Sequence, residues 1–236
     1  KTPCNAVGKG GVHRYKDKVR LIWVYPAHMT YAEGMFAMPL IQAYKEQVGG
    51  MYAMWFKFQA GHMRLIRSRK PRGYTFLAAD WSKFDTSLPA WLIRDAFSIL
   101  RDRLDFGAYQ YWGAPTDPTS LPNLWQTIVR YFINTPLKLP DGRVIVKNQG
   151  IPSGSFFTSL VGSVCNAIML NYLLSVYSYD ERALFVYGDD SVTAVKTTEI
   201  NCLRQIAAEA SATFGSTLSV EKSELSEFPI FLGYRF

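Results

Sequence analysis

The pattern of apolar and polar residues is clearest in the second half of the chain. Residues 183–187 (ALFVY) and 191–195 (SVTAV) are short apolar runs of strand length. Only Gly188, Asp189 and Asp190 separate them. Because glycine and aspartate favour tight turns, we predict two strands joined as a hairpin.

The same half of the chain contains two helical patterns. Residues 199–214 carry apolar side chains at helical spacing, with Thr198 as a candidate N-cap and Gly215 as a candidate stop. A further strand is expected at 217–221. Residues 156–179 hold no charge over a length that could cross a bilayer, but several serines and asparagines interrupt them. We therefore predict a helix buried in protein with one polar edge facing a site, and no membrane span.

The first half shows a buried strand at 74–80 (YTFLAAD), which leaves Asp80 at its carboxyl end. Pro89 suits the first position of a helix that we expect to reach residue 104. A loop is expected at 113–123, and Asp141-Gly142 predicts a hairpin over 137–147. A helix is expected at 30–48, and residues 16–25 become strand-like after Val19.

From residue 74 onward, with the proline-rich segment treated as an insertion, the predicted order is strand, helix, strand, strand, helix, strand. This is the split βαβ arrangement of ferredoxin-like domains, so the expected fold class is α+β, with helices on an antiparallel sheet.

The net charge differs in sign between the first third of the chain and the rest. The first 75 residues have a net charge of +10 and the remaining 161 a net charge of −3, within a total of +7. This distribution indicates a polyanion held near a site built from carboxylates. The 48% hydrophobic content excludes a disordered tail. Three scattered cysteines argue against a disulfide framework and favour a reducing compartment.

Adjacent carboxylates at a tight turn repel each other, and a divalent cation removes that penalty. Hard oxygen donors of this kind suit Mg²⁺ or Mn²⁺. Asp80 follows a strand that the split βαβ order sets beside the hairpin, so it can share cations with Asp189 and Asp190. Two ions bridged by carboxylates are the arrangement that supports phosphoryl transfer. The plainer alternatives are a solvated turn for the hairpin and a capping role for Asp80.

Three ordered motifs make a resemblance specific. DWSKFD (80–85), GIPSGSFFT (150–158) followed by Cys165-Asn166, and YGDD (187–190) resemble motifs A, B and C of viral RNA-dependent RNA polymerases. KDKVRLIWVYP (16–26) resembles motif F, and FLGY (231–234) resembles motif E. The amino-acid sequences of these motifs are most similar to those of the partitivirus and picobirnavirus-like branch of double-stranded RNA viruses.

The resemblance implies roles for the carboxylates. Asp80 and Asp189 match the metal-binding aspartates, with Asp190 as an auxiliary ligand, and two Mg²⁺ or Mn²⁺ ions are implied. Asp85 matches the residue that senses the ribose 2′-hydroxyl of the incoming nucleotide, where its carboxylate accepts a hydrogen bond. Capping of the helix that opens at Pro89 is the alternative for Asp85.

Motif B implies nucleotide contacts for Ser153, Gly154, Thr158 and Asn166. Ser153 fits an N-cap of the long helix equally well. The chain departs from many positive-strand virus polymerases at Gly162, where they carry an asparagine that partners the motif A aspartate. Thr158 and Ser163 are the candidate substitutes for that asparagine.

Motif F implies that Lys18 and Arg20, with Lys16 as a weaker candidate, bind the triphosphate. Spacing of two along a strand puts them on one face. A solvated edge strand is the alternative. Lys222 is the candidate for the lysine of motif D that protonates leaving pyrophosphate. A surface lysine without a role fits that position equally well.

The resemblance implies the palm and partial fingers of a right-hand polymerase. The expected domains are partial fingers with motif F at 1–73, palm at 74–112, a fingers insertion with hairpin at 113–149, and palm again at 150–236. The thumb is expected to be absent, and the first residue, Lys1, indicates a fragment or processed product.

The implied function is RNA-directed RNA polymerisation for viral replication and transcription. The implied partners are template and nascent RNA, NTPs and the viral capsid protein. The implied location is the host cytoplasm, in virions or replication complexes. Two alternatives stay open: a reverse transcriptase on the same palm, which Asp85 and the GDD triplet disfavour, and a non-catalytic RNA-binding remnant.

Overall fold

The computed structural model describes residues 2–11, 18–111, 113–196 and 203–236. The chain divides into two compact units, Lys1–Leu40 with Pro89–Thr158 and Ile41–Leu88 with Ser159–Phe236. These divisions fall elsewhere than the expected boundaries of fingers and palm, which stay a prediction. Each unit is described by itself.

The first unit contains a four-stranded sheet in the order β2-β1-β5-β6. β1 pairs antiparallel with β2 and parallel with β5, and β5 forms the predicted hairpin with β6 around Gly142. The strands span Cys4–Gly11 (β1), Lys18–Val24 (β2), Pro136–Lys138 (β5) and Val144–Val146 (β6).

The helices of the first unit pack around a cluster of aromatic rings. They are α4 (Ala90–Arg101), α5 (Ser120–Ile133) and the first part of α1 (Ala27–Glu46). Trp125 on α5 contacts the rings of Phe36, Phe97 and Phe157 edge to face. Such ring contacts add to the burial of apolar area that stabilises this unit.

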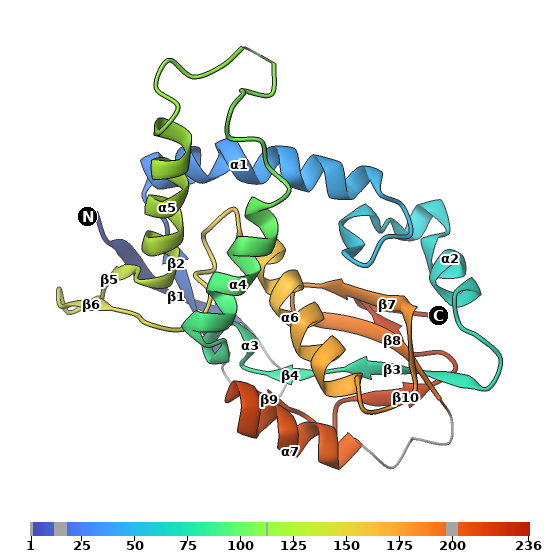
Figure 1. Cartoon of the computed structure of the whole chain (residues 1–236). Coiled ribbons are helices and arrows are strands. Elements are labelled where there is room, and N and C mark those ends of the chain that lie inside the picture. Colours follow the sequence, from blue (N-terminus) through green and yellow to red (C-terminus); the bar gives the residue numbers. More distant parts are fainter. Residues whose placement is uncertain (1, 12–17, 112, 197–202) are drawn as a thin grey trace. The chain divides into compact units, whose positions relative to one another are not determined.

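The second unit contains the sheet on which the candidate chemistry depends, in the order β10-β3-β8-β7 (Figure 1). All its neighbours pair antiparallel. The strands span Tyr74–Ala79 (β3), Tyr179–Tyr187 (β7), Asp190–Lys196 (β8) and Glu224–Ser226 (β10). The helices that connect them are α6 (Thr158–Leu174) and α7 (Leu203–Phe214).

One face of this sheet packs on the core of the second unit. Phe76, Phe185 and Val192 are fully buried there against Trp55 and Phe231. Their immediate neighbours in sequence, such as Leu184 and Thr193, are buried on the opposite face. Because both faces are covered, the strands are almost continuously apolar, as their sequences indicate.

Short elements complete the second unit. They are η1 (Ala53–Trp55), η2 (Phe58–Ala60), α2 (His62–Ser68), β4 (Trp81–Ser82), α3 (Phe84–Ser87), β9 (Thr217–Leu218), β11 (Ile230–Phe231) and β12 (Tyr234–Arg235). β11 and β12 form a tight hairpin across the FLGY segment, with Leu232 and Gly233 at positive φ.

The split βαβ prediction is confirmed in its strand order, because the first and third strands, β3 and β8, are neighbours at the centre. The helix between β3 and β7 within this unit is α6. One detail of the prediction was wrong: the fourth strand of the sheet is β10, because β9 pairs with β4 instead.

The sequence patterns also missed helix α5. Its first turn contains Pro122, and the expected loop at 113–123 overlaps the start of the helix. Proline is tolerated in a first helical turn because the N–H groups there have no intrahelical partner. The predicted N-cap Thr198 lies outside the described residues, and Gly215 ends α7 at a φ of +67° as expected.

Candidate active site

The turn between β7 and β8 presents adjacent carboxylates at one end of the sheet. Tyr187 pairs with Asp190 across the ladder, so Gly188 and Asp189 form the tip. Gly188 has a φ of +61°, a conformation that side chains disfavour, although a Cβ there would meet no atom within 4 Å. Glycine is therefore favoured at this position by the backbone conformation, because a side chain would have enough space there.

Helix α6 fixes this turn through two of its polar side chains, Asn166 and Ser163. The Asn166 amide donates to the carbonyl oxygens of Gly188 (3.0 Å) and Asp189 (3.1 Å). Its Oδ1 accepts from the indole Nε1 of Trp81 (3.0 Å). Ser163 Oγ accepts from the Gly188 N–H (2.8 Å). The polar edge predicted for this helix is thus confirmed, and it holds the aspartate turn.

Asn166 therefore has another role than the nucleotide contact expected from the motif. It is fully buried, and both ends of its amide are engaged. We assign it to positioning, because it links the residue after Asp80 to the turn that carries Asp189. The hydroxyl of Ser163 also donates to the carbonyl of Ser159, so it is not available to replace the missing asparagine at Gly162.

Asp80 is brought to the turn by strand pairing. β3 and β8 pair with Ala79 opposite Ser191, and the continued register sets Asp80 opposite Asp190. Directly opposed residues of an antiparallel pair have Cα atoms about 4.5–5.5 Å apart. The expectation that Asp80 lies beside the hairpin is confirmed at the level of the backbone.

The backbone of Asp80 is held on its other side by the segment after β9. Its N–H donates to Ser223 Oγ (3.1 Å), and its carbonyl accepts from the Ser219 N–H (2.8 Å). Lys222 lies in this same turn and is exposed. The structure therefore brings the turn of Lys222 next to Asp80, while the proton-donor role of its amine stays a prediction.

The electrostatics of the turn reflect burial first and crowded negative charge second. Burial, and then the charges of Asp189 and Asp80, raise the pKa of Asp190 to about 6. Partial burial of the carboxyl and then the charge of Asp189 also raise the pKa of Asp85. Asp85 is a residue of α3. The N-cap position of α4 is Pro89, and no side chain caps it, so the capping role considered for Asp85 is wrong.

The donor chemistry of these carboxylates fits a hard divalent cation, since oxygen donors and uncompensated negative charge are what such an ion requires. In the described ranges, no group of three or more His, Cys, Asp or Glu side chains has the geometry of a metal site. The fit of a cation to this site therefore rests on three observations: the carboxylate oxygens, the strand register that sets Asp80 beside the turn, and the raised pKa of Asp190.

The GIPSGSFFT segment lies in the first unit, where it contacts β2. Ser153 Oγ accepts from the Trp23 N–H (3.0 Å), and α6 starts only at Thr158, so Ser153 is not its N-cap. A Cβ on Gly154 would overlap the Trp23 carbonyl oxygen. Glycine is required here because the two backbones approach so closely.

A buried carboxylate from α1 holds the next turn of this segment. Glu33 Oε2 accepts from Ser155 Oγ (2.7 Å) and from the Phe156 N–H (2.9 Å). Burial raises the pKa of Glu33 to about 7, and its hydrogen bonds oppose that rise. Thr158 Oγ1 donates to the carbonyls of Pro152 and Ser155, so its hydroxyl is likewise engaged within the segment.

The candidate triphosphate ligands of motif F are only partly described. Lys16 lies outside the described residues. Lys18 and Arg20 lie on β2, opposite Gly11 and Lys9 of β1, at the expected spacing of two. Their triphosphate contacts stay a prediction.

Sequence reasoning missed three positioning groups: Glu33, Trp81 and the pair Ser219 and Ser223. Two of these groups had a signal in the sequence. Trp81 belongs to the DWSKFD motif, and Glu33 is the single acidic residue of an otherwise uncharged stretch from Tyr25 to Tyr44. None of the helices in the described parts of the chain combines the length and apolar character needed to cross a bilayer.

Comparison with known proteins agrees with this geometry. A family profile described as viral RNA-dependent RNA polymerase matches residues 12–236. The RNA-directed RNA polymerase of Cryptosporidium parvum virus 1 (strain KSU-1) is 32% identical over 188 residues, which are 78% of this chain and 33% of that protein. The corresponding protein of White clover cryptic virus 1 (isolate Boccardo/2004) is 30% identical over 239 residues, covering 89% of this chain and 37% of the relative.

The fold also matches solved structures. The crystal structure of the RNA-dependent RNA polymerase of a human picobirnavirus superposes with a TM-score of 0.78 at 17% sequence identity, over 98% of this chain and 42% of that one. Its insertion loop deletion mutant gives a TM-score of 0.77 at 18% identity. The chain spans about a third of the length of the two curated relatives. With the profile matched over nearly all its residues, the chain belongs to the viral RNA-dependent RNA polymerase family.

Proposed function

We propose that this chain is the catalytic core of an RNA-directed RNA polymerase that adds NTPs to an RNA 3′ end on an RNA template. The observation that carries the proposal is the register of β3 on β8, which sets Asp80 beside the Asp189-Asp190 turn. Family membership implies the use of divalent metal ions. Curated relatives of similar sequence are RNA-directed RNA polymerases of viruses.

In the proposed reaction, the 3′-hydroxyl oxygen of the nascent RNA attacks the α-phosphorus of a templated NTP. The new P–O bond forms as the bond to the pyrophosphate oxygen breaks. Asp80 and Asp189, with Asp190 as auxiliary ligand, would hold two Mg²⁺ or Mn²⁺ ions. Such ions lower the pKa of an attacking hydroxyl and stabilise charge on leaving oxygens.

The other site residues are proposed to select and orient the nucleotide. Asp85 accepts a hydrogen bond from the ribose 2′-hydroxyl, which favours ribonucleotides. Lys18 and Arg20, and Lys16 with them, bind the triphosphate oxygens. The Ser153-Gly154 segment shapes the nucleotide site, and Lys222 donates a proton to the leaving pyrophosphate.

The expected partners are template RNA, nascent RNA and NTPs. The capsid protein as a partner, and the host cytoplasm as the location, rest on the resemblance to double-stranded RNA virus polymerases and are proposed on that basis alone.

The test is magnesium-dependent NTP incorporation by a polymerase containing this chain. We expect Asp189→Asn and Asp80→Asn each to abolish incorporation, because a neutral amide is a poor ligand for Mg²⁺. Asp95→Asn on the exposed side of α4 is the matched control and should keep wild-type rates. Near-normal rates in either site variant would contradict the metal assignment.

The same assay separates the alternatives. Preferential incorporation of dNTPs would indicate a reverse transcriptase. RNA binding that depends on salt concentration, without any metal-dependent synthesis, would indicate a non-catalytic remnant.

A further inference from the structure

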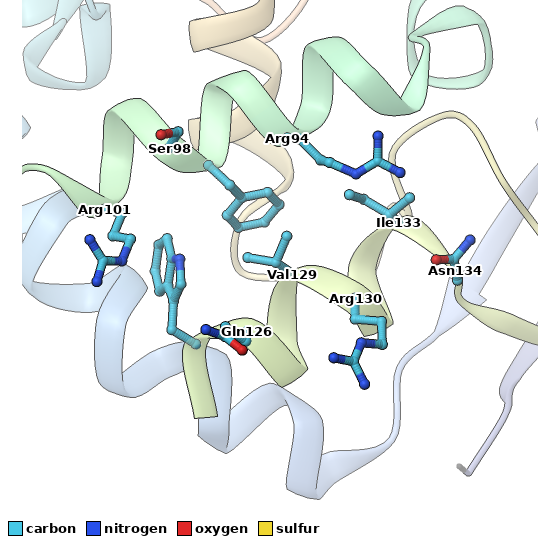
Figure 2. Close-up of a pocket in the computed structure, with 10 residues that line it drawn as sticks. Arg94, Ser98, Arg101, Gln126, Val129, Arg130, Ile133 and Asn134 are labelled. Carbon is cyan, nitrogen blue, oxygen red and sulfur yellow. The ribbon is translucent and has the colours of Figure 1, made fainter. Parts of the chain in front are cut away.

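A groove of about 490 Å³ runs between α4 and α5 of the first unit (Figure 2). It involves none of the residues assigned to nucleotide addition. Its polar lining comes from Arg94, Ser98 and Arg101 on α4, and from Gln126, Arg130 and Asn134 at α5. Phe97, Trp125, Val129 and Ile133 complete the lining.

The arrangement of α4 gathers positive charge on the groove. Arg94, Ser98 and Arg101 are spaced four and three residues apart, which puts them on one face of the helix. Asp95 and Asp102 follow the two arginines directly in sequence, about 100° further around the helix axis. No acidic residue is among the ten that line the groove.

The three arginines, Arg94, Arg101 and Arg130, are exposed, so their guanidinium groups are accessible to a ligand. None of them takes part in an ion pair that the described residues form. Arg101 also lies over the ring of Phe106, at 5.0 Å from its centroid, which leaves the guanidinium charged. Figure 2 shows Arg94 and Arg130 on opposite helices at one end of the groove, and Arg101 at the other.

The three largest apolar side chains of the lining offer little of their own surface to a ligand. Phe97 is 1% exposed, and Trp125 and Ile133 are 3% exposed. Peptide partners gain most of their affinity from apolar anchors inserted into pockets, and nucleobases gain theirs from stacking on open ring faces. Because the rings of Phe97 and Trp125 are buried, no ring face is open for stacking, and the three arginines are the lining residues best placed to hold a ligand.

We propose that this groove binds the sugar-phosphate backbone of single-stranded RNA without regard to sequence. The inference rests on the proposed function, since an RNA polymerase encounters single-stranded RNA as template and product. Guanidinium groups pair bidentately with phosphate oxygens, and three of them around one groove fit a chain with several phosphates. Ser98, Gln126 and Asn134 supply further hydrogen bonds.

The test is binding of a fluorescently labelled oligouridylate by anisotropy, over a series of salt concentrations. The triple variant Arg94→Gln, Arg101→Gln, Arg130→Gln is expected to weaken binding at least about tenfold near 0.1 M salt. It should also reduce the slope of log K against log salt by about 2, since each lost phosphate contact on a single strand contributes about 0.7.

The matched control removes the same charge elsewhere. Arg143, Arg182 and Arg235 are exposed and each pairs with a carboxylate. Their triple substitution by glutamine should leave the slope nearly unchanged. Thermal unfolding of both triple variants checks that they fold. A lysine version of the groove variant, which keeps charge and loses the bidentate fork, should keep most of the slope with weaker affinity.

An unchanged slope in the groove variant, or an equal loss in the control, would overturn the proposal. Loss of polyglutamate binding with RNA binding intact would assign the groove to an acidic peptide instead, and would also overturn it. The two measurements distinguish a failure of the groove proposal from a failure of the catalytic proposal. Asp189→Asn should abolish NTP incorporation and leave oligouridylate binding by the groove intact.

Discussion

Glu33 is a single side chain on which the conformation of a whole segment depends. It is fully buried on α1, yet it accepts two hydrogen bonds from residues more than 120 positions away, Ser155 and Phe156. A buried carboxylate in this setting is costly when ionised, which is why its pKa is raised.

This cost predicts a pH dependence of stability. The pKa of Glu33 is about 7 in the folded chain against an ordinary value of 4.5, so the folded state holds its proton more tightly. The free energy of unfolding should therefore fall as pH rises from about 4.5 to 7, by on the order of 3 kcal/mol. Glu33→Gln, which is neutral throughout and keeps an acceptor oxygen, should lack this component.

Urea unfolding of both proteins at pH 5 and pH 8 measures the difference. Glu181→Gln, a substitution of an exposed carboxylate, is the control and should follow the wild type. A Glu33→Gln protein whose stability falls with pH as much as the wild type would contradict the assignment.

At the scale of elements, α6 acts as a support for the aspartate turn. Ser163 and Asn166 are three residues apart, so they lie on the same face of the helix. Together they bond the N–H and C=O of Gly188 and the C=O of Asp189. A turn that carries repelling carboxylates needs such external hydrogen bonds, because its own charges disfavour it.

Asn166→Ala should destabilise the chain by about 2–3 kcal/mol, since it removes the hydrogen-bond partner of the Trp81 indole N–H and of the Gly188 and Asp189 carbonyls. It should also slow NTP incorporation, with the fall in kcat exceeding any rise in KM, because the turn proposed to hold the metal ions is displaced and the proposed nucleotide contacts are not. Asn123→Ala on the exposed face of α5 is the control. Wild-type stability in Asn166→Ala would contradict the positioning role.

At the scale of the whole molecule, each compact unit has its own core, and the candidate carboxylates all lie in the second. There the sheet is covered on both faces, and Phe185 sits at the centre of the cluster formed with Trp55 and Val192. Ring contact between Phe185 and Trp55, at 6.0 Å between centroids, ties the strand before the aspartate turn to η1.

Phe185→Ala should cost about 3–5 kcal/mol, the range for removing a buried ring that leaves a cavity. Thermal unfolding monitored by circular dichroism measures it. Tyr111→Ala removes a ring that is 79% exposed and should change the melting temperature little. A similar loss in both variants would contradict the placement of the core.

Much of the fold could be predicted from local pattern. The β7–β8 hairpin, β3, α6 and the stop of α7 at Gly215 all follow from runs of apolar residues and from turn chemistry. The missed elements have weak local signals. α5 begins among prolines, and β10 is three residues long and recognisable only through its pairing with β3.

The sequence by itself determined the fold class, the family and which acidic residues are candidates for chemistry, because periodicity, turns and motifs are local properties of the chain. Tertiary structure alone decided how those residues are held. Glu33 on Ser155, Trp81 on Asn166 and Ser223 on Asp80 each join positions 85 to 143 residues apart. The arginine groove has the same origin, since α4 and α5 supply it from separate stretches. Such contacts depend on packing, which no short stretch of sequence encodes.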